Sequence, residues 1–155
     1  MPGTFSQIYI QLIFAVKGRN SLIHASWETE LYKFISGIVR NKEQKILAIN
    51  AMPDHIHILV GIKPSCSISD LVREIKKSSN DFIKERKFTN HKFQWQEDYG
   101  AFSYSHSNLD AVIKYVLNQK VHHQKKTFKE EYYDFLDKFE VDYKAEYLFE
   151  WLEDN

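Results

Sequence analysis

The chain of 155 residues is long enough for one domain with a sizeable core, and 15% aromatic residues with only five Gly exclude a disordered protein. Its single cysteine, Cys66, excludes an internal disulfide. The net charge is zero, but residues 1–126 carry 18 Lys and Arg against 11 Asp and Glu, while residues 127–155 carry 3 against 10. A basic body with an acidic tail fits either nucleic-acid binding or two solvated faces.

Neither a signal peptide nor a membrane span is visible in the sequence. The N-terminus lacks a basic segment before an apolar one, and no apolar run is long enough to cross a bilayer. We therefore expect a cytoplasmic protein with no membrane partner.

The first half of the chain predicts two strands around a helix. Apolar and polar residues alternate over 5–16, which is typical of a strand with one buried face. Apolar residues then recur at helical spacing from Ser26 to about Lys42, and residues 44–50 form a second predicted strand.

The next strand carries the first candidate site. His55 and His57 are separated by one apolar residue in a β-branched run, so their side chains share one face while Ile56 and Ile58 share the other. Two imidazoles on one face of a stiff strand make half of a metal site.

The second half predicts a helix, a strand and two further helices. Ser67 or Ser69 can cap a helix whose outer face is basic, and residues 94–103 read as a fourth strand. Helices are predicted at about 109–123 and 128–139. The order β-α-β-β-α-β followed by helices is that of an α+β, ferredoxin-like (RRM-like) antiparallel sheet. Its two crossover helices should cover the Ile56 face, leaving the histidine face for chemistry or for the third helix.

The third helix carries the second candidate site. Tyr115 lies roughly opposite the apolar stripe of that helix, and Gln119 follows four residues later on the same face. His122 and His123 continue this face. They could support the site from behind, contact DNA or lie at the surface, and we favour the surface.

These motifs resemble the single-tyrosine HUH transposases, small insertion-sequence enzymes with the REP-associated tyrosine transposases as relatives. Met52-Pro53-Asp54-His55-Ile56-His57 is similar to the family's histidine–hydrophobic–histidine motif, and Tyr115-Val116-Leu117-Asn118-Gln119 is similar to its tyrosine helix. The likeness extends over nearly the whole chain. We therefore treat 1–155 as one domain, with a core at about 5–123 and an acidic helical tail at about 127–155.

The resemblance implies a dimer that cuts and rejoins single-stranded DNA bearing a hairpin. Tyr115 would be the nucleophile that forms a 5′-phosphotyrosine link, in its own or in the partner subunit's site. His55, His57 and Gln119 would hold a divalent metal, Mg²⁺ or Mn²⁺. The basic helix would offer Arg73, Lys76 and Lys77 to phosphates of the hairpin.

Three alternatives remain open at the level of sequence. The chain could be a domesticated relative that processes repeated genomic hairpins, or a non-catalytic nucleic-acid-binding module that stacks bases on its sheet. It could also be a Zn²⁺-dependent hydrolase of small phosphoesters. That third class needs a further ligand, and strand alternation predicts that Asp54 points away from His55.

Overall fold

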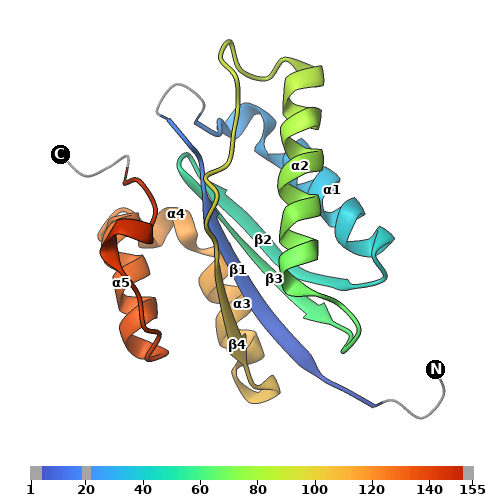
Figure 1. Cartoon of the computed structure of the whole chain (residues 1–155), viewed down its shortest axis with the longest axis vertical. Coiled ribbons are helices and arrows are strands. Elements are labelled where there is room, and N and C mark those ends of the chain that lie inside the picture. Colours follow the sequence, from blue (N-terminus) through green and yellow to red (C-terminus); the bar gives the residue numbers. More distant parts are fainter. Residues whose placement is uncertain (1–4, 19–21, 152–155) are drawn as a thin grey trace.

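The structure, a computed structural model, describes residues 5–18 and 22–151 (Figure 1). Its strands and helices are, in chain order, β1 (Ile8–Ala15), α1 (Ala25–Asn41), β2 (Lys45–Met52), β3 (His55–Ile62), α2 (Ile68–Arg86), β4 (Gly100–Tyr104), α3 (Leu109–Leu117), α4 (Gln119–His122) and α5 (Phe128–Lys138). In the part of the chain so described, no helix combines the length and the apolar character that a membrane crossing requires.

The four strands form one antiparallel sheet in the order β2-β3-β1-β4. This order and the helical crossovers confirm the predicted ferredoxin-like fold. The two central strands are β1 and β3, and Ala15 and Ile13 of β1 stand opposite His55 and His57 of β3. The histidines therefore sit at the middle of the sheet, where the backbone is hydrogen-bonded on both sides.

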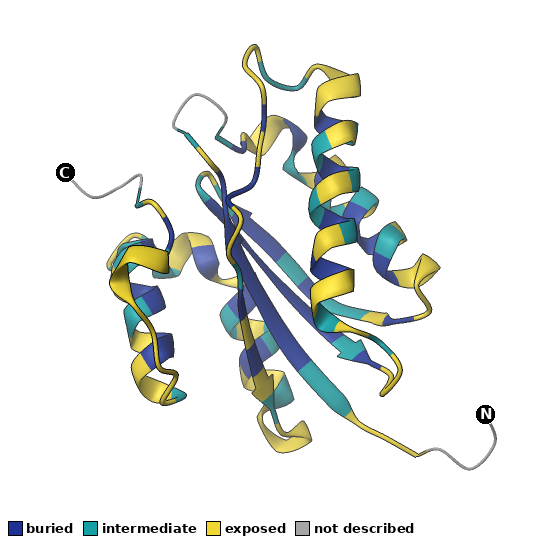
Figure 2. Ribbon diagram, in the orientation of Figure 1, coloured by how far each residue is buried: buried dark blue, intermediate teal, exposed yellow. Residues whose placement is uncertain are grey.

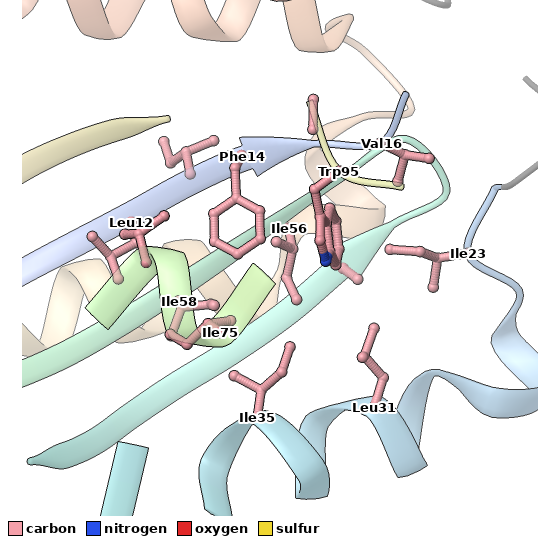
Figure 3. Packing of buried hydrophobic residues seen from close by; sticks show 14 of the residues in the cluster. Leu12, Phe14, Val16, Ile23, Leu31, Ile35, Ile56, Ile58, Ile75 and Trp95 are labelled. Atoms are coloured by element: carbon pink, nitrogen blue, oxygen red, sulfur yellow. The ribbon is translucent and has the colours of Figure 1, made fainter. Parts of the chain in front are cut away.

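The main core lies between the sheet and the two crossover helices. Leu12, Phe14, Ile56 and Ile58 point from β1 and β3 toward α1 and α2, and each is fully buried (Figure 3). Because side chains alternate along a strand, this packing forces His55 and His57 to the opposite face, as predicted.

That opposite face is covered as well. Val112 and Val116 of α3 pack on Ala48 and Leu59 of β2 and β3 in a second, smaller core. The helix α5 lies beside α3 in Figure 1, and Figure 2 shows its buried positions on the side turned toward the sheet. Both faces of the sheet are thus shielded, and any site on the histidine face is enclosed.

The predicted fourth strand is shorter than expected. Only Gly100–Tyr104 pairs with β1 as a ladder, and Trp95 forms an isolated bridge with Val16. Between them the chain turns outward because Lys76 donates from Nζ to the carbonyl oxygens of residues 96, 97 and 98, at 2.7, 2.9 and 3.0 Å.

The predicted helix at 109–123 is interrupted at Asn118, between α3 and α4. Asn50 of β2 causes the break by donating from Nδ2 to the carbonyl oxygens of Val116 and Leu117, at 3.0 and 3.1 Å. These bonds end α3 and set the direction of α4. Leu117, the last residue of α3, is 56% exposed.

Candidate active site

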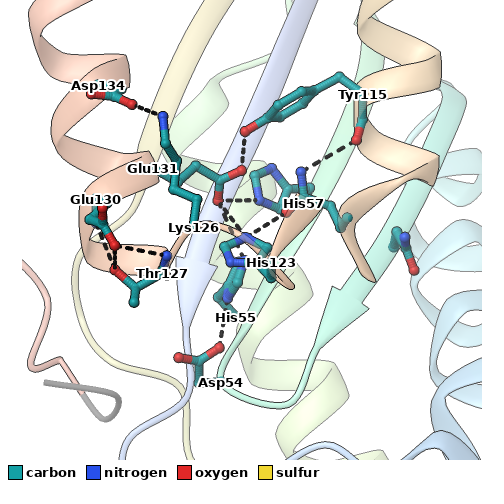
Figure 4. Close-up of polar contacts among 12 residues, drawn as sticks. Asp54, His55, His57, Tyr115, His123, Lys126, Thr127, Glu130, Glu131 and Asp134 are labelled. Carbon is teal, nitrogen blue, oxygen red and sulfur yellow. Dashed lines mark hydrogen bonds and ion pairs between the residues drawn. The ribbon is translucent and has the colours of Figure 1, made fainter. Parts of the chain in front are cut away.

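His55 and His57 lie in an enclosed chamber between the sheet, α4 and α5 (Figure 4). Both side chains are fully buried, and their ring centroids are 5.1 Å apart. A buried imidazole needs polar partners, so each of these rings must have hydrogen-bond partners nearby.

Each ring has a partner behind it at Nδ1. Nδ1 of His57 lies 2.6 Å from Oε1 of Gln11, and Nδ1 of His55 lies 2.7 Å from Oδ1 of Asp54. Amide and carboxylate oxygens only accept, so Nδ1 donates in both rings and Nε2 faces the chamber. The expectation that Asp54 points away from His55 was wrong, because Asp54 lies in the turn before β3, where strand alternation does not apply.

The Nε2 atoms converge on a residue that the sequence did not reveal, Glu131 of α5. Its Oε1 lies 3.2 Å from Nε2 of His57, 3.6 Å from Nε2 of His55 and 3.0 Å from Nε2 of His123. The side chain of His123 is 4% exposed, so the prediction that this histidine lies at the surface was wrong. Three imidazoles and a carboxylate, all within 4.8 Å of one another, form the centre of the site.

A signal for Glu131 does exist in the sequence. Phe128, Tyr132 and Phe135 form the buried stripe of α5, and Glu131 falls within that stripe rather than on the acidic face. A carboxylate inside an apolar stripe needs a buried partner. In a tail with many other acidic residues, such a carboxylate is easy to overlook.

Tyr115 and Gln119 join the same centre from α3 and α4. The Tyr115 hydroxyl donates to Oε2 of Glu131, and its ring lies 6.0 Å from that of His57. Gln119 is fully buried, and its Oε1 lies 2.9 Å from Nε2 of His123. The predicted common face of Tyr115 and Gln119 is therefore turned toward the histidines of the same chain.

The electrostatics of the site are those of a paired buried acid. Burial opposes ionisation of Glu131, but attraction to His57 and a hydrogen bond from His123 outweigh it and hold the pKa of that carboxyl well below its usual range. Burial likewise opposes the charge on His55, yet Asp54 and Glu131 raise the pKa of His55 to about 9. Glu131 is therefore an anion in a chamber of imidazoles.

The pKa of Tyr115 is shifted so that the proton is held more tightly, unlike that of Glu131. Burial, and next to it the negative charge of Glu131, raise the pKa of the phenol above its ordinary value. The hydroxyl is neutral at pH 7 and keeps its proton directed at the carboxylate. Any reaction in which this oxygen attacks must give that proton an acceptor.

The donor set fits a divalent cation. Within the described residues, Nε2 of His55 is a fully buried nitrogen without a hydrogen-bond partner, and it faces Glu131. Four ligands at about 2.0–2.1 Å from one tetrahedral ion stand about 3.3 Å apart. Oε1 lies 3.0–3.6 Å from the three nitrogens, and all four atoms lie within 4.8 Å of one another. A small rearrangement of these side chains would enclose an ion.

A cavity of about 440 Å³ gives access to the site between α3 and α5. Its lining includes Tyr115, Glu131, Tyr104 and Lys126. That volume is within the range of small-ligand pockets, so a polymer end or a nucleotide can reach the Tyr115 hydroxyl.

The predicted phosphate-binding cations lie elsewhere. Arg73, Lys76 and Lys77 belong to α2, which packs on the sheet face opposite the histidines. Arg73 and Lys77 are exposed, and Arg73 pairs with Asp70 at 3.0 Å. Lys76 uses its ammonium group for the three carbonyls of the 96–98 segment.

Comparison with known sequences gives one family and one curated relative. Residues 4–119 match the family described as "Transposase IS200 like". The ISDra2 transposase TnpA of Deinococcus radiodurans is 23% identical over 124 residues, which cover 76% of this chain and 87% of that protein. His123 and Glu131 lie beyond the segment that the family matches.

Two solved structures share the fold. A candidate transposase from Deinococcus radiodurans has a TM-score of 0.60 at 22% identity, over 77% of this chain and 95% of that one. A REP-associated tyrosine transposase bound to a REP hairpin has a TM-score of 0.59 at 18% identity, over 75% of this chain and 68% of that one.

Proposed function

The chain belongs to the family of IS200-like transposases, and from this we propose that it cuts and rejoins single-stranded DNA with Tyr115 as the nucleophile. One observation carries the proposal: the Tyr115 hydroxyl shares a carboxylate with His57 inside one enclosed site. A tyrosine whose only purpose was packing would need no such arrangement. Because tyrosine and histidines come from the same chain, we further propose that Tyr115 acts in cis.

We propose that His55 and His57 hold a divalent metal ion, with Gln119 beside them. When bound, the ion would polarise the scissile phosphate and stabilise its developing charge. Gln11 and Asp54 fix the ring orientation, so both Nε2 atoms face the chamber before any ion arrives.

The proposed reaction is a phosphoryl transfer to the phenol. The Tyr115 oxygen attacks the phosphorus, an O–P bond to the tyrosine forms, and the bond from phosphorus to the 3′ oxygen breaks. The phenolic proton becomes far more acidic as the bond forms and passes to Glu131, which already accepts it in a hydrogen bond. The departing 3′ oxygen takes a proton from solvent, and a 3′-hydroxyl is released. Attack by a second 3′-hydroxyl on the phosphotyrosine reverses these steps and joins the strands.

The proposed substrate is single-stranded DNA with a hairpin. We propose that the protein acts on it in the cytoplasm. Support comes from the structural neighbour that was solved with a REP hairpin. Arg73 and Lys77 could bind phosphates of such a hairpin on the outer face of α2, while Lys76 has its donors engaged. A homodimer, which the family resemblance suggests, would place two such surfaces together.

A second candidate is a relative that processes repeated genomic hairpins without transposing. The two structural neighbours match this fold almost equally, with TM-scores of 0.60 and 0.59, and the second is REP-associated. The non-catalytic module finds less support, because the sheet face that would stack bases is covered by α3 and α5.

The test is a covalent adduct on a denaturing gel. The protein is mixed with labelled single-stranded hairpin DNA from the sequence flanking its own gene, with Mn²⁺ or Mg²⁺. We expect a protein-sized shift that needs the metal, is lost in Tyr115→Phe and persists in Tyr147→Phe, which alters a tyrosine that is 65% exposed. Cleavage without an adduct would indicate a hydrolase, and an adduct that survives Tyr115→Phe would remove this tyrosine from its role.

A further inference from the structure

We propose that this chain binds its divalent ion with three histidines and a carboxylate, His55, His57, His123 and Glu131, and that Glu131 holds Tyr115 against the same centre. The inference deepens the proposed function and rests on it only for the role of Tyr115. The ligand set itself can be tested without DNA.

The geometry makes Glu131 the hub of the site. Its Oε1 lies between 3.0 and 3.6 Å from Nε2 of all three histidines, while its Oε2 accepts the Tyr115 hydroxyl (Figure 4). One carboxylate thus spans the distance from the ligand cluster to the nucleophile.

Charge gives an independent reason for an ion. Glu131 is 2% exposed, and within residues 5–18 and 22–151 its ion pairs are all with histidines. A buried carboxylate is costly without a positive charge, and in these contacts only imidazoles, not Lys or Arg, can supply one in place of a metal ion. The unpartnered Nε2 of His55 adds a fully buried donor aimed at the same place.

Two of the four ligands come from outside the segment matched by the family, which ends at residue 119. α4 brings His123 and α5 brings Glu131, and the aromatic stripe of α5 fixes its position against the core. In this arrangement Gln119 is a positioning residue, since its Oε1 lies 2.9 Å from Nε2 of His123.

The donor chemistry selects the class of ion. Mg²⁺ prefers an octahedron of oxygens and keeps several waters, whereas imidazoles suit borderline transition-metal ions. Imidazole nitrogens and carboxylate oxygens are common ligands of Zn²⁺, and Mn²⁺ or Co²⁺ can occupy the same donors. We infer that Mg²⁺ binds this centre far more weakly than these ions do.

The experiment measures Zn²⁺ and Mg²⁺ binding to the full chain without DNA, by competition with a coloured chelator. We expect one tight Zn²⁺ site, and a loss of affinity of about 10–100-fold or more in both Glu131→Gln and His123→Asn. His122→Asn and Asp137→Asn are matched controls, since they alter the neighbouring histidine and an exposed acid of α5 and should leave binding unchanged.

The contrary outcome is equally specific. If Gln119→Ala abolishes Zn²⁺ binding while Glu131→Gln and His123→Asn bind normally, the ligand set is His55, His57 and Gln119, and the proposal is overturned. Circular dichroism of each variant shows whether it has folded.

A second measurement needs no variant. In the unaltered protein, histidine side-chain NMR should show Zn²⁺-dependent shifts at Nε2 of three of the seven histidines. Shifts confined to two histidines would remove His123 from the centre. Tyr115→Phe should retain Zn²⁺ binding. If the unaltered protein binds Zn²⁺ but forms no adduct with hairpin DNA, the proposed function is contradicted while the proposed metal centre is supported.

Discussion

Asp54 and Gln11 contact Nδ1 of the two strand histidines, and the two contacts differ in charge. Asp54 presents a carboxylate to Nδ1 of His55, whereas Gln11 presents a neutral amide to Nδ1 of His57. A carboxylate partner makes the opposite nitrogen of an imidazole more electron-rich, so His55 should be the stronger ligand.

We expect Asp54→Asn to weaken Zn²⁺ binding by about 10–100-fold, because the amide keeps the shape of the carboxylate and removes its charge. The same chelator competition measures the effect. Asp110→Asn, a change at an exposed acid of α3, serves as the control. Equal affinities in Asp54→Asn and the unaltered chain would mean that His55 does not depend on this contact.

Lys76 is a structural cation rather than a free one. Its Nζ holds three carbonyl groups of the 96–98 segment and lies 5.3 Å from the ring centroid of Phe14. The carbonyl contact at Gln96 is partly buried, whereas those at Glu97 and Asp98 are exposed.

We expect Lys76→Met to lower the free energy of unfolding by about 1–3 kcal/mol, since it removes three hydrogen bonds from a charged donor, one of them partly buried. Lys77→Met, at an exposed position on the same helix, should change it by less than about 0.5 kcal/mol. Urea denaturation of both variants decides the matter. Two equal midpoints would show that the contacts of Lys76 contribute nothing to stability.

At the scale of elements, α5 decides whether Glu131 reaches the chamber. The helix begins with a capping box, in which the Thr127 side chain accepts from the backbone of Glu130 and the Glu130 side chain accepts from the backbone of Thr127. Such a box satisfies amide groups that the first turn would otherwise leave unpaired.

Loss of this cap should loosen the first turn of α5, where Glu131 lies. We expect Thr127→Ala to cost about 1 kcal/mol of stability and to weaken Zn²⁺ binding, while Thr127→Ser retains both. Thermal unfolding and chelator competition on the pair provide the measurements. An Ala variant that binds Zn²⁺ as tightly as the Ser variant would uncouple the cap from the centre.

The elements also show what the sequence could and could not reveal. Alternation in β3 was sufficient to place His55 and His57 on the non-core face, and helical spacing was sufficient to align Tyr115 with Gln119. The ends of α3 and β4 were not predictable, because Asn50 and Lys76 set them through contacts with distant backbone carbonyls. His123 and Glu131 were missed for a similar reason: their burial depends on how α4 and α5 fold back onto β3.

At the scale of the whole molecule, the centre ties together parts of the chain that are far apart in sequence. Glu131 is 74 residues from His57, and Tyr115 lies between them. An ion bound there would connect β3, α4 and α5 in the folded protein and would have no equivalent site in the unfolded chain.

Ion binding should therefore stabilise the whole fold. We expect Zn²⁺ at about 100 times its dissociation constant to raise the free energy of unfolding by about 2.7 kcal/mol, and a chelator to reverse the gain. Denaturation with and without the metal measures this difference. In Glu131→Gln the gain at the same Zn²⁺ concentration should shrink, and an undiminished gain would place the stabilising ion elsewhere.

The break at Asn118 limits where residues can be inserted into this chain. Tyr115, Gln119 and His123 recur every four residues, on either side of a junction fixed by Asn50. One residue inserted between Tyr115 and His123 would turn the later side chains by about 100° and carry them out of the chamber. The exposed loop before Trp95 has no such register to keep. Lineages descended from this sequence should accordingly gain and lose residues in that loop while the distance from tyrosine to histidine stays fixed.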